Sequence, residues 1–190
     1  MSAALAPSSR YRFTIAEVRA MAEAGLLREP ERLELIEGEL ITMPADGARH
    51  RDWSYALMIW LTQHLGPDHV IIPGSTLELS SYNGPKPDWY VFPAGLETAA
   101  VSGPDVLLAI EQADSSLAYD LGLKAGLYAR FGVRDYWVVD LAKRIIHVHR
   151  DPTPEGYGWK RRVMANEPIE ALLLPGLALT LDALPRVGAG

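Results

Sequence analysis

The sequence predicts a single α/β domain over residues 11–190, preceded by a loose tail at residues 1–10 that is rich in Ala, Pro and Ser. Continuous apolar runs at residues 106–110 and 136–139 are typical of strands that are covered on both faces of a sheet. An amphipathic helical pattern at residues 115–131 lies between them. Such a strand–helix–strand unit makes a right-handed crossover between parallel strands, so we expect parallel neighbours at the centre of the sheet.

The first part of the domain is predicted to contain a helix followed by a hairpin. Thr14 and Glu17 have the spacing of a capping box, which begins a helix that ends at Gly25. Residues 33–43 have the pattern of two short strands that turn at residues 37–38.

A second amphipathic helix is predicted at residues 50–65, with His50 at one end of its apolar stripe. The remaining elements are expected as strands at residues 70–72, 77–79 and 89–92, a turn at residues 83–84, and an edge hairpin at residues 144–164.

The composition limits the kinds of metal site and the cellular compartment that are expected. The 190 residues include no cysteine, which excludes disulfides and thiolate metal sites and is typical of a reducing compartment. The sequence has no recognisable signal peptide and no apolar run of the roughly 20 residues that span a bilayer, so we expect a cytoplasmic protein without membrane association. Carboxylate, carbonyl or imidazole groups would hold any metal, which favours Mg²⁺ or Mn²⁺.

The charge balance bears on nucleic acid as a partner. A net charge of −6 argues against tight nonspecific binding to DNA, because binding to phosphates needs a basic surface. Residues 160–162, Lys-Arg-Arg, form a local basic run that could still face DNA. The charge balance therefore does not exclude a nuclease.

Three polar residues interrupt the apolar pattern. Glu111 ends the run of the first buried strand, where the ligand sites of open α/β sheets gather; the alternative is a carboxylate that meets solvent or caps the next helix. Lys124 interrupts the inward stripe of the following helix, where an ammonium group must either meet a carboxylate or reach water. Asp88 follows a proline and begins a short strand, although turn aspartates of this kind are common. Glu111 supplies the partner that Lys124 needs.

At these positions the sequence resembles the PD-(D/E)XK, or restriction-endonuclease-like, nuclease superfamily, and within it a widespread bacterial family of restriction-endonuclease-like proteins of unknown biological role. The resemblance covers about residues 12–185. One departure concerns the literal Glu-x-Lys motif, which would place lysine at Ala113; in the bacterial family the lysine comes from the following helix, which matches Lys124. The matching segments are Leu33 to Leu40, Arg49-His50, Pro87-Asp88, Ile110 to Ser116, Lys124 to Val133, and Tyr136 to Asp140.

The resemblance implies a fold and an activity. The fold is a central mixed sheet in an αβββαβ core, whose core helices are residues 50–65 and 115–131, with an N-terminal helix-hairpin and a C-terminal hairpin added. The activity is that of a metal-dependent endonuclease, a hydrolase of phosphodiester bonds, with DNA expected before RNA. Nuclease folds of this type often work as dimers, so a homodimer or higher homo-oligomer is expected by analogy.

The resemblance also implies roles for individual residues. Asp88 and Glu111 would bind Mg²⁺ or Mn²⁺, joined by the backbone carbonyl of Gln112, which stands where the family has valine. Lys124 would orient or help to deprotonate the attacking water. His50 would contact phosphate or orient a ligand, or else it is a histidine satisfied at a helix terminus.

Other interpretations remain open from the sequence. The first is a catalytically silent protein with a nuclease-like fold that serves in binding or assembly. The second is a metal-dependent hydrolase of small phosphorylated substrates. Glu34, in the predicted hairpin, is a further acidic candidate, although a solvated strand residue is the simpler interpretation.

Overall fold

A computed structural model describes residues 10–185, so the predicted tail at residues 1–10 lies outside the described residues except for Arg10. The chain folds into two compact units. Among the described residues, the smaller unit comprises residues 10–44 and 78–85, and the larger one comprises residues 45–77 and 86–185. That residues 11–190 act as one domain stays a prediction. None of the helices within residues 10–185 is both long and apolar enough to cross a membrane.

In the smaller unit, helix α1 (Ile15–Glu23) begins where the capping box predicts. The Glu17 amide donates to the Thr14 hydroxyl at 3.2 Å, and the Thr14 amide donates back to the Glu17 carboxylate at 2.8 Å. Two backbone amides that have no partner within the helix are satisfied in this way. Gly25 follows with a φ of +68°, as expected of a glycine that ends a helix.

The predicted hairpin of the smaller unit is confirmed. Strands β1 (Leu33–Ile36) and β2 (Glu39–Thr42) are antiparallel, and Ile36 pairs with Glu39. Glu37 and Gly38 both have positive φ values, 53° and 82°, as a tight two-residue hairpin requires.

The predictions for residues 77–79 and 83–84 were wrong. Residues 77–79 form no strand, because the amides of Leu79 and Ser80 donate to the carbonyl of Asn83 across a tight turn instead of to a neighbouring strand. The turn lies at residues 81–82, and the Asn83 side chain accepts a hydrogen bond from the Glu37 amide at 2.8 Å.

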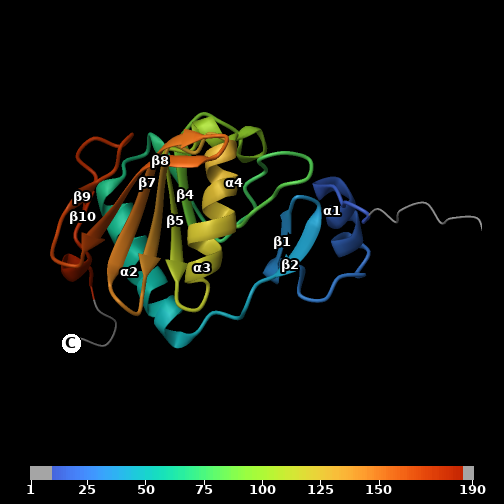
Figure 1. The fold of residues 1–190 in the computed structure, drawn as a ribbon, viewed down its shortest axis with the longest axis horizontal. Coiled ribbons are helices and arrows are strands. Elements are labelled where there is room, and N and C mark those ends of the chain that lie inside the picture. Colours follow the sequence, from blue (N-terminus) through green and yellow to red (C-terminus); the bar gives the residue numbers. More distant parts are fainter. Residues whose placement is uncertain (1–9, 186–190) are drawn as a thin grey trace, which may run out of the picture. The chain divides into compact units, whose positions relative to one another are not determined.

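A mixed six-stranded sheet lies at the centre of the larger unit (Figure 1). Its strand order is β3-β4-β5-β6-β7-β8, and β5 and β6 are the parallel pair, which confirms the predicted crossover. The strands β7 and β8 form the predicted C-terminal hairpin, with β8 at the edge. The strands are β3 (His69–Pro73), β4 (Trp89–Pro93), β5 (Leu108–Ala113), β6 (Asp135–Asp140), β7 (Ile145–Thr153) and β8 (Gly156–Met164).

Helices cover both faces of this sheet (Figure 1). Helix α2 (Ala48–His64) lies on one face, where Trp60 stacks on Trp137 of β6 with ring centroids 6.4 Å apart. The neighbouring Tyr136 points to the other face and donates its hydroxyl to the carbonyl of Asp120 at 2.9 Å. The helical segments on that face are α3 (Leu117–Tyr119), a π-helical turn (Asp120–Lys124) and α4 (Ala125–Arg130). The order α2-β3-β4-β5-α3/α4-β6 is the expected αβββαβ core.

The main apolar core lies between α2 and the sheet, and the C-terminal segment closes it. Leu57, Leu61 and Trp137 are among its fully buried members. Burial of each such side chain stabilises the fold by about 1.5–3 kcal/mol relative to its exposure. The last elements are the short strands β9 (Ile169–Glu170) and β10 (Ala178–Leu179) and a 3₁₀ turn (Leu181–Ala183).

A buried histidine on the opposite face of the sheet makes the stability of the fold depend on pH. His149 of β7 is 4% exposed and lies beside the stacked rings of Tyr136 and Tyr157. Burial, followed by the nearby charge of Lys160, lowers its pKa from 6.5 to about 4. Below pH 6.5, His149 binds a proton in the unfolded chain but stays neutral in the folded chain. The free energy of unfolding therefore falls as the pH decreases from about 6.5 to about 4.

We expect this loss to amount to roughly 2 kcal/mol between pH 7.5 and pH 5. His149→Phe keeps an aromatic ring among the tyrosines and removes the titration. Urea unfolding of the two proteins at both pH values measures the difference. The same loss in His149→Phe would show that another group is responsible.

Candidate active site

Glu111 lies inside strand β5 and not at its end. The apolar run stops at Ile110, but the backbone pairing continues through Gln112 and Ala113, which pair with Val139 and Asp140 of β6. The prediction that Glu111 ends the strand was therefore wrong, because the ladder of backbone hydrogen bonds extends past the apolar residues. Glu111 is buried, and its side chain lies on the face that α3 and α4 cover.

Lys124 meets Glu111 in the interior of the larger unit. Its Nζ lies 2.6 Å from Glu111 Oε1, and the side chains are 0% and 4% exposed. The hydroxyl of Tyr128 donates to the same carboxylate oxygen at 3.0 Å, and Lys124 Nζ also donates to the carbonyl of Lys86 at 3.4 Å. Lys124 therefore does not reach water along the edge of the stripe. The charge-assisted contacts offset part of the cost of burying two ions.

A π-helical turn carries Lys124. The sequence predicted one regular helix over residues 115–131, whereas the structure widens it at Asp120–Lys124, where the amide of Ala125 reaches back to the carbonyl of Asp120. Ser116 lies at the N-cap, but its hydroxyl donates to the Asp120 carboxylate at 2.5 Å and not to a backbone group. Turns of this kind inside α-helices occur frequently at functional sites.

Asp88 lies immediately before β4 and beside Gln112. The backbone amide of Gln112 donates to Asp88 Oδ2 at 2.6 Å. The carboxylate is 25% exposed, and its other oxygen lies 3.1 Å from Nε2 of His50. Asp88 is thus held by two neighbours that belong to other elements, which an ordinary turn aspartate does not require. The structure brings it next to the strand residue that follows Glu111.

His50, in the first turn of α2, contacts Asp88 directly. Its side chain is 13% exposed. Burial opposes its protonation, but the hydrogen bond and charge of Asp88, together with the charges of Asp46 and Asp114, outweigh burial and raise its pKa. His50 therefore has a carboxylate partner that the sequence alone did not assign to it.

The backbone of Gln112 contacts Asp88, whereas its side chain contacts helix α2. Its carboxamide exchanges hydrogen bonds with the Ser54 hydroxyl of α2, at 3.0 and 3.4 Å. Its neighbour Glu111 points to the opposite face, as the alternation along a strand requires. The carboxamide is thus engaged on the α2 side, which leaves the backbone carbonyl as the group predicted to act as a metal ligand.

The donor set decides which cation suits this place. Within residues 10–185, no three His, Cys, Asp or Glu side chains form a group that could hold a metal. Asp88 and Glu111 offer two carboxylates, and Mg²⁺ is commonly bound by one or two carboxylates while it keeps several waters. These donors are of the type that Mg²⁺ or Mn²⁺ prefers and are too few for an all-protein zinc site, so the metal stays a prediction.

Several neighbours of the site were not singled out from the sequence. Tyr128 lies four residues after Lys124 and Ser54 four residues after His50, so helical spacing was the signal that could have found both. In the smaller unit, Glu34 was expected to be solvated but is fully buried, as are the next two residues of β1, so burial does not alternate along this strand.

Comparison with known proteins adds two findings. The model of the Uma2 family, described as "Putative restriction endonuclease", matches residues 16–182 and so includes every residue of the candidate site. The chain also resembles the crystal structure of "a putative nuclease belonging to DUF820" from Anabaena variabilis, with a TM-score of 0.64 and 16% sequence identity over 85% of this chain and 94% of that chain. At this identity the likeness concerns the fold. No curated protein matches the sequence.

Proposed function

Because the chain belongs to the Uma2 family of restriction-endonuclease-like proteins, we propose that it is a metal-dependent nuclease that hydrolyses phosphodiester bonds, with DNA as the expected substrate. One observation carries the proposal. Lys124 pairs with Glu111 in the interior, and the amide next to Glu111 holds Asp88. The Lys124–Glu111 pair on β5 and the Asp88 carboxylate before β4 thus belong to neighbouring strands, which supports a site that combines two acids and one amine.

The chain's own residues would divide the work as follows. Asp88, Glu111 and the carbonyl of Gln112 would hold Mg²⁺ or Mn²⁺, which when bound would supply an activated water and neutralise phosphate charge. Lys124, which meets Glu111 as an ammonium, would orient that water and stabilise the charge that develops on the phosphate.

Two further residues would act by positioning the acids. The Tyr128 hydroxyl fixes the rotamer of Glu111, and His50 fixes that of Asp88. Ligands that are held by such outer contacts need little rearrangement when they bind a cation.

The proposal is tested with supercoiled plasmid in the presence of Mg²⁺, Mn²⁺ or EDTA. We expect nicked or linear product with either cation, and complete loss of cleavage when EDTA removes the metal. Cleavage that persists in EDTA would contradict the metal dependence. Absence of both cleavage and calorimetric Mn²⁺ binding would favour the silent binding protein instead, and turnover of nucleotide esters without polymer cleavage would favour the hydrolase of small substrates.

A further inference from the structure

Positive charge is concentrated in the last hairpin of the sheet. Residues 143–162 contain six Lys or Arg (Lys143, Arg144, Arg150, Lys160, Arg161 and Arg162) and two acids (Asp151 and Glu155), a net charge of +4. The whole chain carries −6, so the rest of the sequence carries −10. This hairpin is therefore the part of the protein to which an anion would be drawn.

Two of these cations lie on the face of the sheet to which Glu111 points. Glu111 pairs with Val138, Val138 with His147, and His147 with Arg162, so the four residues form one row across β5 to β8. Directly paired residues point to the same face, so Arg162 shares the face of Glu111. Lys160, two residues away along β8, also points to that face. Three strand spacings separate Arg162 from Glu111, roughly 14 Å.

Ion pairing separates these two residues from the other arginines of the hairpin, and Lys143 differs from them because it does not line the pocket described below. Arg144 pairs with Asp182 at 2.6 Å, and Arg150 pairs with Asp135 at 2.9 Å. Arg161 pairs with Glu167 at 3.6 Å.

Lys160 and Arg162 are both exposed and have no carboxylate partner within residues 10–185. After burial, the charge of Arg162 lowers the pKa of His147, and that of Lys160 lowers the pKa of His149. Both effects agree with the excess of positive charge counted along this hairpin.

These two cations line a pocket of about 340 Å³, together with Leu121 of the π-helical turn and with His147 and His149 of β7. Val148 and Arg161 also border the pocket, although alternation along β7 and β8 directs their side chains to the opposite face of the sheet.

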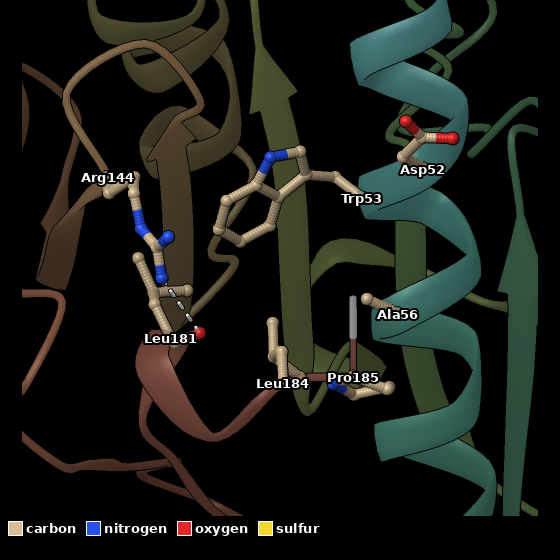
Figure 2. A pocket seen from close by; sticks show the side chains of 7 residues that line it. All are labelled: Asp52, Trp53, Ala56, Arg144, Leu181, Leu184 and Pro185. Carbon is tan, nitrogen blue, oxygen red and sulfur yellow. Dashed lines mark hydrogen bonds between the residues drawn. The ribbon is translucent and has the colours of Figure 1, made fainter. Parts of the chain in front are cut away.

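A second pocket of about 240 Å³, on the α2 side, offers no comparable charge (Figure 2). Its cation, Arg144, lies 5.7 Å from the Trp53 ring and is neutralised by Asp182, and Asp52 adds a negative charge to the lining. An anion is therefore expected at the β8 pocket and not at this one.

We propose that Lys160 and Arg162 form a phosphate-binding site at the edge of the sheet, which holds the backbone of the nucleic acid a short distance from the bond to be cleaved. The inference rests on the proposed function for the identity of the ligand. In B-form DNA, successive phosphates of one strand rise 3.4 Å along the axis, so roughly 14 Å corresponds to about four nucleotides. Such contacts fix the position of a duplex without reading its sequence.

The test is binding of a labelled DNA duplex, measured by fluorescence anisotropy in EDTA so that no cleavage occurs. We expect Arg162→Ala and Lys160→Ala each to weaken Kd about fivefold or more and to reduce the slope of log K against log salt by about 1. Arg161→Ala is the matched control, since it removes the same charge from the adjacent position on the opposite face. We expect it to change Kd by less than about twofold, as is typical of exposed paired charges.

The outcomes separate this inference from the proposed function. Binding that depends on Arg162 but not on Arg161, without cleavage in any metal, would support the site and refute the nuclease. Equal losses for Arg161→Ala and Arg162→Ala, or no binding by the parent protein, would overturn the site even if the protein cleaves plasmid. The third measurement is a titration with inorganic phosphate. If phosphate binding requires Arg162 but the substitutions leave the affinity for DNA unchanged, the pocket binds free phosphate and the proposal is overturned.

Discussion

Replacing Lys124 with methionine is expected to lower the free energy of unfolding by about 3–5 kcal/mol, the usual cost of removing one partner of a buried ion pair. Methionine fills much of the volume of the lysine side chain, so little of this loss would come from a cavity. The cost arises because Glu111, 3% exposed, keeps a carboxylate in the interior without the ammonium that lies 2.6 Å away. Urea unfolding at neutral pH measures the change.

The control for this prediction is the double substitution Lys124→Met with Glu111→Gln. It removes both charges, and the Tyr128 hydroxyl can still donate to the amide oxygen that replaces the carboxylate. We expect the double variant to be more stable than Lys124→Met alone by about 1–3 kcal/mol, because it no longer leaves a charge unpaired in the interior. If Lys124→Met has the same free energy of unfolding as the parent protein, then the Lys124 ammonium is not buried against Glu111 in the way that the structure shows.

This ion pair also changes how the catalytic role of Lys124 has to be tested. A variant at Lys124 that fails to cleave could fail because it is less folded, since a marginal domain has only about 5–15 kcal/mol of stability. The cleavage assay must therefore be run where each variant is shown by circular dichroism to be folded. Loss of cleavage in a folded Lys124→Met protein would support the proposed role in orienting water.

Lys124 is the clearest case in which sequence reasoning reached the right environment. A lysine on the inward stripe of a helix needs a carboxylate, and the preceding strand carried one. The π-helical turn that presents Lys124 was not predictable in the same way. One widened turn adds a single residue to the helical period, and the pattern over residues 115–131 is too short to reveal it.

Contacts between segments that are distant along the chain were also not predictable from the sequence. The contact between His50 and Asp88 joins the start of α2 to the start of β4, and neither residue signals the other in the sequence. Residues 77–79 have side chains that are typical of a strand, but they do not pair with another strand in the structure. Whether a segment forms a strand depends on the strand beside it, which a local sequence pattern does not reveal. The capping box at Thr14 was predictable because its two partners lie three residues apart.

Asp88→Asn is expected to reduce metal-dependent cleavage by at least about a thousandfold. Neutral asparagine keeps the shape of aspartate, and its side-chain oxygen can still accept the Gln112 amide that Asp88 accepts at 2.6 Å. It loses the negative charge that would hold the cation, and metal stabilisation of a transition state amounts to several kcal/mol, with each 1.36 kcal/mol equal to tenfold in rate. Single-turnover cleavage of plasmid in Mg²⁺ and calorimetric titration with Mn²⁺ measure the two losses.

The chain offers a matched control in its other Pro-Asp dipeptide, Pro104-Asp105. Asp105 precedes β5 and binds Ser102 within a short 3₁₀ turn, far along the strand from the end at which Gln112 holds Asp88. Asp105→Asn removes the same charge and costs at most the stability of one cap, about 1 kcal/mol, so its cleavage rate is expected to equal that of the parent. Because Asp88 is 25% exposed, its neutralisation leaves no buried charge unpaired, and Asp88→Asn should unfold within about 1 kcal/mol of the parent. If folded Asp88→Asn protein still binds Mn²⁺ and cleaves at the parental rate, then Asp88 is not a ligand of the metal. The mechanism proposed above, in which Asp88 and Glu111 hold the metal, would then be wrong.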